Sequence, residues 1–342
     1  MTNNTAATRT TDTDGGIGNE AEVVSPLRTI ARMVARRLAR SVVLLFIVSI
    51  AAFGLIWLVP GNPASTLAGE FPSQEEIAAV ESALGLDAPP HRQYIDWLGS
   101  ALTGDLGESL RSGRSVSSEI TARLPATLSI TFFAVVFALL VAVPVGTLAA
   151  VRRGSLSDRL LTVGSTLGVA TPSFFVAILL VIFVALNSDF FPATGYVGPS
   201  ESIYDWVRHN TLPGIALGLA LAAELARQIR SALIDVLRSD YVRTARAKGI
   251  PERIVLTKHA YKNSALPVVT ILGAQIATLV GGTVIIESIF AMPGIGGLAI
   301  SSVLSQDIPV IQGIVLVVGA LVVAVNTLVD ISYGFFDPRT RQ

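Results

Sequence analysis

The sequence predicts an all-α integral membrane protein with six transmembrane helices. Of its 342 residues, 51% are hydrophobic and only 15% are charged, and the mean hydropathy is +0.62. Soluble domains carry about 25% charged residues, so this composition indicates a chain that lies in lipid. Six apolar segments are long enough to cross about 30 Å of hydrocarbon at about 1.5 Å per residue. These segments lie at 42–59, 126–151, 160–187, 212–233, 265–286 and 308–332.

The N-terminal region divides into a polar tail and a basic segment that leads into the first span. Residues 1–25 are rich in Gly, Thr and Asn, cannot bury a core, and are predicted to form a disordered cytosolic tail. Residues 26–59 contain the basic segment and the first span. This span is longer than the apolar part of a signal peptide and lacks a small-residue cleavage site after it, so we expect it to be retained.

Residues 60–125 are predicted to form a helical loop outside the membrane. A capping box at Ser73–Glu76 begins one short helix, which Gly85 closes. A second amphipathic stretch before Gly104 places Tyr94, Trp97, Leu98 and Ala101 on one face. Two helices folded onto the rim of the bundle explain this pattern, and so does a cap that docks a partner. The two interpretations are compatible.

Residues 126–333 are predicted to form a five-span core, followed by a cytosolic tail at 334–342. Prolines within or at the ends of the spans indicate kinks, which are tolerated where neighbouring helices satisfy the freed carbonyl groups. They are Pro144, Pro172, Pro213 and Pro267.

Small residues recur at every fourth position in two of the core spans, which allows helices to approach closely. Packing within the chain and contact with a second subunit both explain such stripes, and the sequence does not decide between them. The stripes are Gly214, Gly218 and Ala222, and Gly273, Ala277 and Gly281.

The distribution of basic residues predicts the orientation, because cytosolic loops carry an excess of Lys and Arg. The asymmetry and the even number of spans place both termini in the cytosol. The residues assigned to the cytosolic side are Arg28, Arg32, Arg36, Arg37, Arg40, Arg152, Arg153, Arg159, Arg238, Arg243, Arg246, Lys248, Arg253, Lys258, Lys262, Arg339 and Arg341. Only Arg92, Arg111, Arg114, Arg123 and Arg208 fall on the other side.

Ionisable residues near membrane depth are few, and we expect each to lie close to the end of a span. They are Glu224, Glu287 and Asp330. An ion-coupled carrier usually keeps charged groups near the middle of the membrane, so this distribution weakens that interpretation.

The sequence lacks the signatures of an enzyme. There is no cysteine, the three histidines lie in separate segments, and no G-x-x-x-x-G-K-[ST], G-x-S-x-G or H-E-x-x-H pattern occurs. We therefore expect no catalytic residue, metal site or cofactor in this chain, and no nucleic-acid partner.

The segment 234–262 is a basic insertion between two apolar spans. Good helix formers fill Asp235–Lys248, Gly249 can adopt the left-handed conformation that ends a helix, and Pro251 suits the start of the next helix. The pattern predicts a helix–turn–helix on the cytosolic side. A polybasic segment that binds lipid is the alternative interpretation.

This insertion resembles the "EAA" loop of permeases in binding-protein-dependent ABC importers. The core of that loop, [EQR]-small-small-x-x-x-Gly, is matched by Arg243, Thr244, Ala245 and Gly249, with Arg243 where many such permeases have Glu. The resemblance implies that the loop docks into a separate ATPase subunit. The residues it assigns to this coupling are Arg243, Thr244, Ala245, Ala247, Gly249, Ile250 and Pro251.

The rest of the chain, from about Ile30 to Arg341, resembles the "B" permease of dipeptide and oligopeptide importers. The strings that carry this resemblance are Leu58–Pro63, Leu84–Asp87, Gly104–Ser109, Arg123–Leu128, Glu287–Gly297 and Asp337–Arg339. It implies a bundle like that of type I ABC importer permeases, in the plasma membrane or cell inner membrane. The Pro and Gly residues of the Glu287–Gly297 string should force a turn at the outer surface, and this turn is a candidate contact for a binding protein. Its residues are Pro293, Gly294, Gly296 and Gly297.

The resemblance implies one half of a translocation pore, with peptides as the expected substrate. Expected partners are a second permease, two ATPase subunits that hold ATP and Mg, an extracytoplasmic substrate-binding protein and membrane lipid. Nickel, oligosaccharides, opine-like compounds and haem pass through similar permeases, so the substrate stays open. An ion-coupled secondary carrier with a lipid-binding basic loop is the alternative, and a membrane scaffold without a pore is a weaker one.

Overall fold

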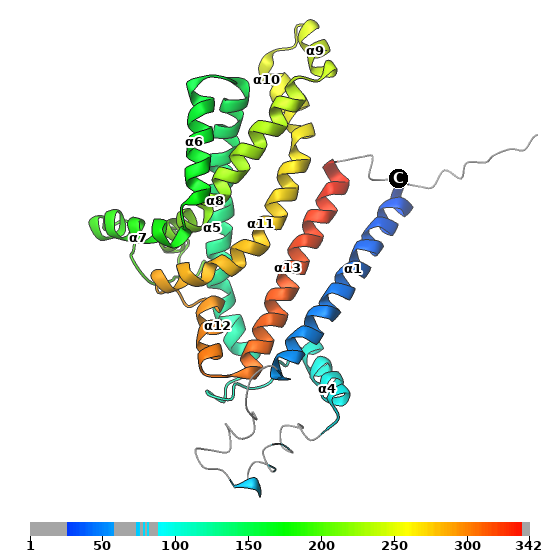
Figure 1. The fold of residues 1–342 in the computed structure, drawn as a ribbon, viewed down its shortest axis with the longest axis vertical. Helices are drawn as coiled ribbons and strands as arrows, with labels where there is room; N and C mark the ends of the chain where they lie inside the picture. Colours follow the sequence, from blue (N-terminus) through cyan, green and yellow to red (C-terminus); the bar gives the residue numbers. More distant parts are fainter. Residues whose placement is uncertain (1–25, 58–72, 76–77, 79–80, 82–87, 337–342) are drawn as a thin grey trace, which may run out of the picture.

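The computed structural model describes residues 26–57, 73–75, 78, 81 and 88–336. The predicted tail 1–25 and most of the helix predicted from Ser73 to Gly85 lie outside the described residues. Within the described part the chain forms a bundle of helices, which confirms the predicted all-α fold (Figure 1). The helices are α1 (Pro26–Gly54), α4 (Pro90–Leu102), α5 (Val116–Val151), α6 (Leu156–Ala170), α7 (Ser173–Phe183), α8 (Ile203–Leu237), α9 (Asp240–Ala247), α10 (Glu252–Ile254), α11 (Tyr261–Ile289), α12 (Ile295–Leu304) and α13 (Ile308–Phe336).

Five of the described helices are long and apolar enough to cross a membrane, and a bent pair can supply the sixth span. The third predicted span, 160–187, is this pair: α6 and the segment Ser173–Asn187 meet at an angle of 98°. The kink predicted at Pro172 is therefore present, as a sharp break between two helices. Pro172 has no N–H to donate, and the residue before a proline avoids the helical region. Thr171 accordingly has ψ 120° and Pro172 has ψ 135°, which ends α6 and starts α7 in a new direction.

Other helices also extend beyond their predicted spans, and α5 and α8 show why. Helix α5 begins at Val116, so the last turns of the predicted outer loop 60–125 belong to this helix, and Pro125 lies inside it. Helix α8 begins at Ile203 instead of Leu212 and contains Pro213. Because apolar content defines a predicted span, the polar first turns of both helices were missed.

The core of the molecule is the crossing of α5 and α8. Ala134, Ala138 and Ala142 of α5 are fully buried, and glycines of α8 lie directly against that helix. A Cβ atom at Gly218 would lie 2.5 Å from the carbonyl oxygen of Ala134, and one at Gly214 would lie 2.5 Å from the Cβ of Phe133. The Gly214 stripe thus packs within the chain and allows the two helix backbones to touch.

The second stripe of small residues, on α11, is only partly used inside the chain. A Cβ at Gly273 would lie 2.7 Å from the side chain of Val329 on α13. At Gly281, by contrast, a Cβ would meet nothing within 4 Å. One end of this stripe therefore packs against α13, and the other end is open.

The predicted amphipathic helix before Gly104 is α4, and it packs on the end of α1. The Tyr94 hydroxyl and the Ser49 hydroxyl are 2.8 Å apart, and the Tyr94 and Phe53 rings meet edge to face at 5.5 Å. This contact confirms that α4 folds onto the rim of the bundle. Docking of a partner by α4 stays a prediction.

The three ionisable residues predicted near the ends of spans do not all lie there. Glu287 lies near the C-terminal end of α11, as expected. Glu224 lies well inside α8, so its predicted place near the end of a span was wrong. Asp330 lies on α13, and its side chain is outside the described part of the chain.

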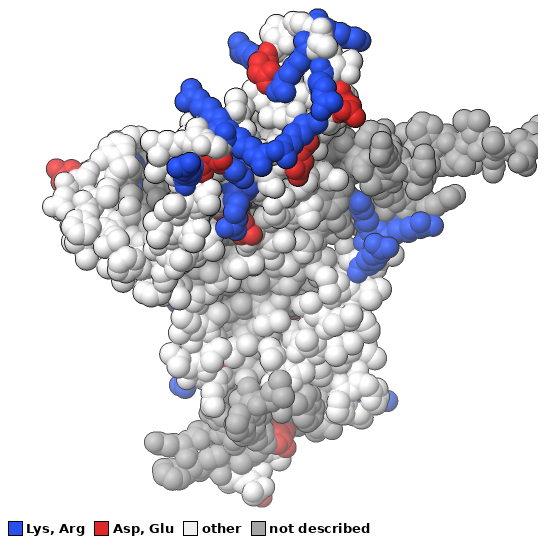
Figure 2. Space-filling view, turned by 45° about the horizontal axis from the view of Figure 1, so that its top comes forward, with Lys and Arg blue, Asp and Glu red and all other residues white. Residues whose placement is uncertain are grey.

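Charge divides the bundle into two ends. Figure 2 shows Lys and Arg side chains gathered at the end that carries α9 and α10, and only scattered ones at the opposite end. We call the first the basic end and the second the distal end. The start of α1, the α5–α6 turn and the α8–α11 connection all lie at the basic end (Figure 1). The predicted charge asymmetry is therefore present in three dimensions.

Candidate functional site

The segment predicted to couple transport to ATP hydrolysis protrudes from the basic end of the bundle. It consists of α9 and α10, which connect α8 to α11 (Figure 1). Residues 255–260 continue from α10 into α11 as a π-helical turn. Such turns are rare and frequently occur at functional sites. The small helix α9 is thus held between the ends of two long spans and would move with them.

The end of α9 is fixed by a glycine in the left-handed conformation. Gly249 has φ +73°, as the sequence predicts. Its N–H donates to the carbonyl of Arg246 at 2.9 Å, and the Ile250 N–H donates to the carbonyl of Ala245 at 3.3 Å. This pair of bonds is the Schellman arrangement, in which glycine avoids the strain that a Cβ would cause. Pro251 then lies just before α10, with φ −58°.

The helix–turn–helix has a small hydrophobic core of its own. Val242 and Val255 are fully buried and Ala245 is 8% exposed, with Ile250 packed against them. Ala245 must therefore be small because it faces the interior of the loop. This differs from the expectation that Ala245 approaches a partner. Ala247, another residue assigned to the coupling, lies on the exposed side.

The outer face of the loop is exposed and charged. The side chains of Arg243 and Asp240 are 79% and 94% exposed and lie 3.4 Å apart. Arg246 bonds Glu252 through two nitrogens, at 2.6 and 3.1 Å, and thereby bridges the turn at Gly249. Donation of these hydrogen bonds to the Glu252 carboxylate raises the pKa of Arg246, so this guanidinium stays charged. Thr244, Ala247 and Pro251 complete the exposed face.

Beneath this loop, an ion pair that sequence reasoning missed joins α6 to α8. Arg230 donates to both carboxylate oxygens of the buried Asp158, with Nη2 at 2.9 Å from Oδ2. Asp158 also accepts from the N–H of Gly154 at 2.8 Å, in the α5–α6 turn. The signal was an arginine within a predicted span, since such a residue usually pairs with another group. The pair fixes the basic end of α8 to its neighbours.

At the distal end, a buried carboxylate organises the turn that was predicted to contact a binding protein. Glu287 is 1% exposed and accepts from the hydroxyl of Thr127 at 2.6 Å and from the N–H of Gly297 at 3.1 Å. A Cβ at Gly294 would lie 2.0 Å from the Glu287 carboxyl carbon. A Cβ at Gly296 would lie 2.8 Å from its Oε2. These two glycines therefore make room for the Glu287 carboxylate.

The four predicted contact residues consequently occupy different positions. Pro293 is exposed in the turn, whereas Gly294 and Gly296 are buried and Gly297 is half-buried. Gly296 and Gly297 belong to the first turn of α12, because this helix starts at Ile295. Only Pro293 fully presents its side chain to a partner. Contact with a binding protein at this turn stays a prediction.

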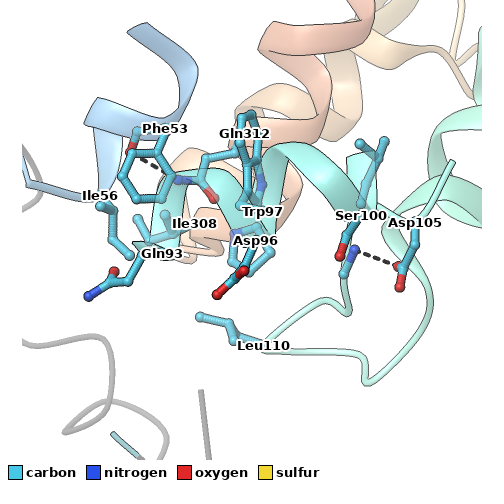
Figure 3. Close-up of a pocket in the computed structure, with 13 residues that line it drawn as sticks. Phe53, Ile56, Gln93, Asp96, Trp97, Ser100, Asp105, Leu110, Ile308 and Gln312 are labelled. Atoms are coloured by element: carbon cyan, nitrogen blue, oxygen red, sulfur yellow. Dashed lines mark hydrogen bonds between the residues drawn. The ribbon is translucent and has the colours of Figure 1, made fainter. Parts of the chain in front are cut away.

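A second feature of the distal end is a cavity of about 340 Å³ between α1, α4 and α13. Figure 3 shows the aromatic rings of Phe53 and Trp97 and the carboxylates of Asp96 and Asp105 around it. Gln312 donates to the carbonyl of Phe53 at 3.1 Å, and Asp105 accepts from the N–H of Gly107 at 2.9 Å. Aromatic faces beside carboxylates are suited to a cationic group.

The described residues contain no group of three or more His, Asp or Glu side chains placed to hold a metal ion. Polar clusters among them include the exposed coupling loop, the Asp158–Arg230 pair and the Glu287 turn. Two of these clusters join helices through buried hydrogen bonds and an ion pair, and the third is an exposed, charged loop at one end of the bundle.

Comparison with known protein families gives two matches. Residues 142–342 match the family described as the binding-protein-dependent transport system inner membrane component. Residues 30–131 match the N-terminal region of the membrane component of such transport systems. Between them the two matches leave out only residues 132–141 of α5 and the first residues of α1 among the long described helices.

Individual relatives are similar along nearly their whole length. A putative peptide transport system permease protein of Brucella abortus (strain 2308) is 40% identical over 309 residues, which cover 90% of this chain and 98% of the relative. The dipeptide transport system permease protein DppB of Alkalihalophilus pseudofirmus is 37% identical over 326 residues, with the same coverage. A probable peptide ABC transporter permease protein of Sinorhizobium fredii is 34% identical over 308 residues, also at 90% and 98%.

Proposed function

This chain belongs to the family of binding-protein-dependent transport system inner membrane components, and from this membership we propose that it forms half of the translocation pore of an ATP-driven peptide importer. The family match and the apolar helices support a multi-pass membrane permease. The observation that carries the choice of peptide is the 34–40% identity, over 90% of this chain, to relatives named as peptide or dipeptide permeases. The alternative of an ion-coupled carrier is not favoured by these relatives.

The partners follow from the type of transport system. A second permease would complete the pore, two ATPase subunits would bind ATP and Mg, and an extracytoplasmic binding protein would deliver the peptide. Two features support a bound ATPase. The loop α9–α10 projects beyond the bundle, and its exposed face carries Arg243, Thr244 and Ala247. A rigid, exposed helix of this kind can insert into a cleft of a partner.

The proposed orientation places the basic end in the cytosol, with both termini on that side. The clustering of Lys and Arg at this end supports it, because cytosolic connections are enriched in these residues. The distal end, with Pro293 and α4, would then face the binding protein. This orientation also puts α9 on the side of the membrane where ATP is available.

The proposed mechanism is a transmission of force through α9. When ATP closes the two ATPase subunits, the docked α9 moves and shifts the ends of α8 and α11, which are continuous with the loop. The equilibrium between inward-open and outward-open pores changes as a result. The Schellman bonds at Gly249 and the Arg246–Glu252 pair keep the element stiff enough to transmit this motion.

The test is purification of the affinity-tagged chain from its native membrane, followed by reconstitution into liposomes. We expect two ATPase subunits and a second permease to copurify, and a labelled dipeptide to enter the liposomes only with ATP and the binding protein present. Dipeptide uptake that follows an ion gradient and does not need ATP would refute the proposal.

A further inference from the structure

Two ionisable side chains, Glu224 and Arg227, follow directly after the longest apolar run of α8, Leu212–Ala223. Glu224 is half-buried and accepts a hydrogen bond from the amide of Gln275, the central residue of α11. Arg227 lies one turn further along α8 and is exposed. Among the described residues, Arg227 makes no ion pair and no side-chain hydrogen bond. A carboxylate, a guanidinium and an amide thus lie within two candidate membrane spans, α8 and α11.

Charged groups within a membrane-spanning helix are costly where they face lipid. Arg, Lys and Asp at the centre of a membrane helix cost about 2.5–3.5 kcal/mol each on insertion scales, so such residues face a water-filled space or the interior of a bundle. The Arg227 side chain can extend toward the basic end, but Glu224 is short and is held against the middle of α11. Lipid contact therefore does not explain this cluster.

The exposed face of α11 next to Gln275 is also poorly suited to lipid. Most of its exposed residues are small or polar, and Ile285 is the only large hydrophobic residue exposed in the span. Helix α1, by contrast, exposes large hydrophobic side chains. Val43, Phe46 and Ile47 are about half exposed and present a face suited to lipid. The exposed residues of α11 toward its middle are Pro267, Thr270, Ala274, Thr278 and Gly281.

We propose that Glu224, Arg227, Gln275 and this exposed face of α11, together called the polar face, line the hydrated path of the pore and bind the peptide in transit. The Glu224 carboxylate would accept from the peptide ammonium or N–H groups, and the Arg227 guanidinium would donate to its carboxylate or carbonyl groups. Residues one turn apart lie about 5–6 Å from each other, which suits contact with one short peptide. The inference rests on the proposed function and adds the residues that touch the substrate.

Introduced cysteines test whether the polar face is hydrated, because the chain has no native cysteine. Thr270→Cys, Ala274→Cys and Thr278→Cys are made singly in the assembled complex in liposomes and treated with a charged methanethiosulfonate reagent. The matched control is Val43→Cys on the lipid-suited face of α1. We expect the α11 positions to react at least roughly tenfold faster, since the reactive thiolate forms in water and not in apolar surroundings.

A second variant tests binding of the peptide. Glu224→Gln keeps the shape of the side chain and an acceptor for Gln275 but removes the charge. We expect ATP hydrolysis stimulated by the loaded binding protein to remain, while dipeptide uptake per ATP falls about tenfold, the scale of one lost charged hydrogen bond. Glu201→Gln, which removes an exposed charge just before α8, should change neither quantity.

The outcomes separate this inference from the proposed function. If the α11 cysteines react no faster than Val43→Cys in the complex, lipid or the second permease covers the face, and the polar face is not the path. If Glu224→Gln leaves uptake unchanged, or lowers uptake and ATP hydrolysis equally, Glu224 does not bind the peptide. If the cysteines react but the wild-type complex takes up no peptide, the substrate is wrong and the hydrated path stands.

Discussion

The Thr127 hydroxyl donates a 2.6 Å hydrogen bond to the carboxylate of Glu287 and accepts one of 2.9 Å from the N–H of Ile295. Both side chains are 1% exposed. One hydroxyl on α5 therefore forms hydrogen bonds with a carboxylate near the end of α11 and with a backbone N–H at the start of α12. This contact fixes the distal turn against the core crossing of α5 and α8.

The first prediction removes this hydroxyl. Thr127→Val keeps the volume of the side chain but deprives Glu287 of a donor and Ile295 of an acceptor. Leaving buried polar groups unpaired costs about 1–3 kcal/mol, and more when one of them is charged. We expect the purified complex to lose its structure at a clearly lower temperature, measured by the fraction that remains monodisperse after heating.

Thr131→Val, one turn along α5, is the control. Thr131 is also buried, but its hydroxyl bonds only the Thr127 carbonyl, which lies within the same helix. Its loss should therefore change the midpoint much less. Equal effects of the two substitutions would show that the Glu287 contact adds no stability.

The second prediction concerns the fit of the glycines around Glu287. Gly294→Ala places a Cβ at 2.0 Å from the Glu287 carboxyl carbon, so the turn has to open. Gly297→Ala, three residues away, meets nothing within 4 Å. We expect Gly294→Ala to lower the yield and the thermal midpoint of the complex, while Gly297→Ala resembles the wild type. If both variants are tolerated, the turn around the carboxylate is not tightly packed.

Much of the fold could be predicted from the sequence because single residue types determine it locally. Apolar runs of sufficient length give the spans at α1, α5, α8, α11 and α13, since no other element satisfies the backbone in lipid. Gly249 was predicted to be left-handed because glycine adopts positive φ with the least strain, and its φ is +73°. Such features depend only on a few neighbouring residues.

The features that were missed depend on residues far apart in the sequence. Thr127 and Glu287 are separated by 160 positions, and Asp158 and Arg230 by 72, so neither pair has a local pattern. The bend of 98° at Pro172 was predicted only as a kink, because proline breaks a helix without fixing the new direction. Direction is set by how α7 packs against α8. Burial of Gly294 and Gly296 likewise follows from the position of Glu287.

The third prediction tests the orientation. Arg153→Cys lies at the basic end between α5 and α6, and Ser200→Cys lies at the distal end before α8. Both positions are exposed. In intact cells an impermeant maleimide should label Ser200→Cys, and it should reach Arg153→Cys only after lysis. Labelling of Arg153→Cys from outside would invert the orientation and remove α9 from the side where ATP is found.

The fourth prediction concerns Gly249, at the end of α9. A Cβ at this position would meet nothing within 4 Å, so a substitution acts through the backbone and not through a clash. Valine at positive φ should cost about 1–2 kcal/mol and distort the Schellman bonds that hold Ile250 against Ala245. We expect Gly249→Val to leave the spans inserted but to release the ATPase subunits or to uncouple ATP hydrolysis from transport.

Gly249→Asn is the matched control, because asparagine adopts the left-handed conformation more easily than other non-glycine residues. It should retain most of the coupling, whereas Lys258→Ala and Lys262→Ala, outside the docking face, should have little effect. Each complex is purified and assayed for retained ATPase subunits and for ATP turnover stimulated by the loaded binding protein. If Gly249→Val retains both and the lysine substitutions abolish them, the charge of the loop matters more than its shape. The loop would then bind lipid, and α9 would not be the element that couples this permease to its ATPases.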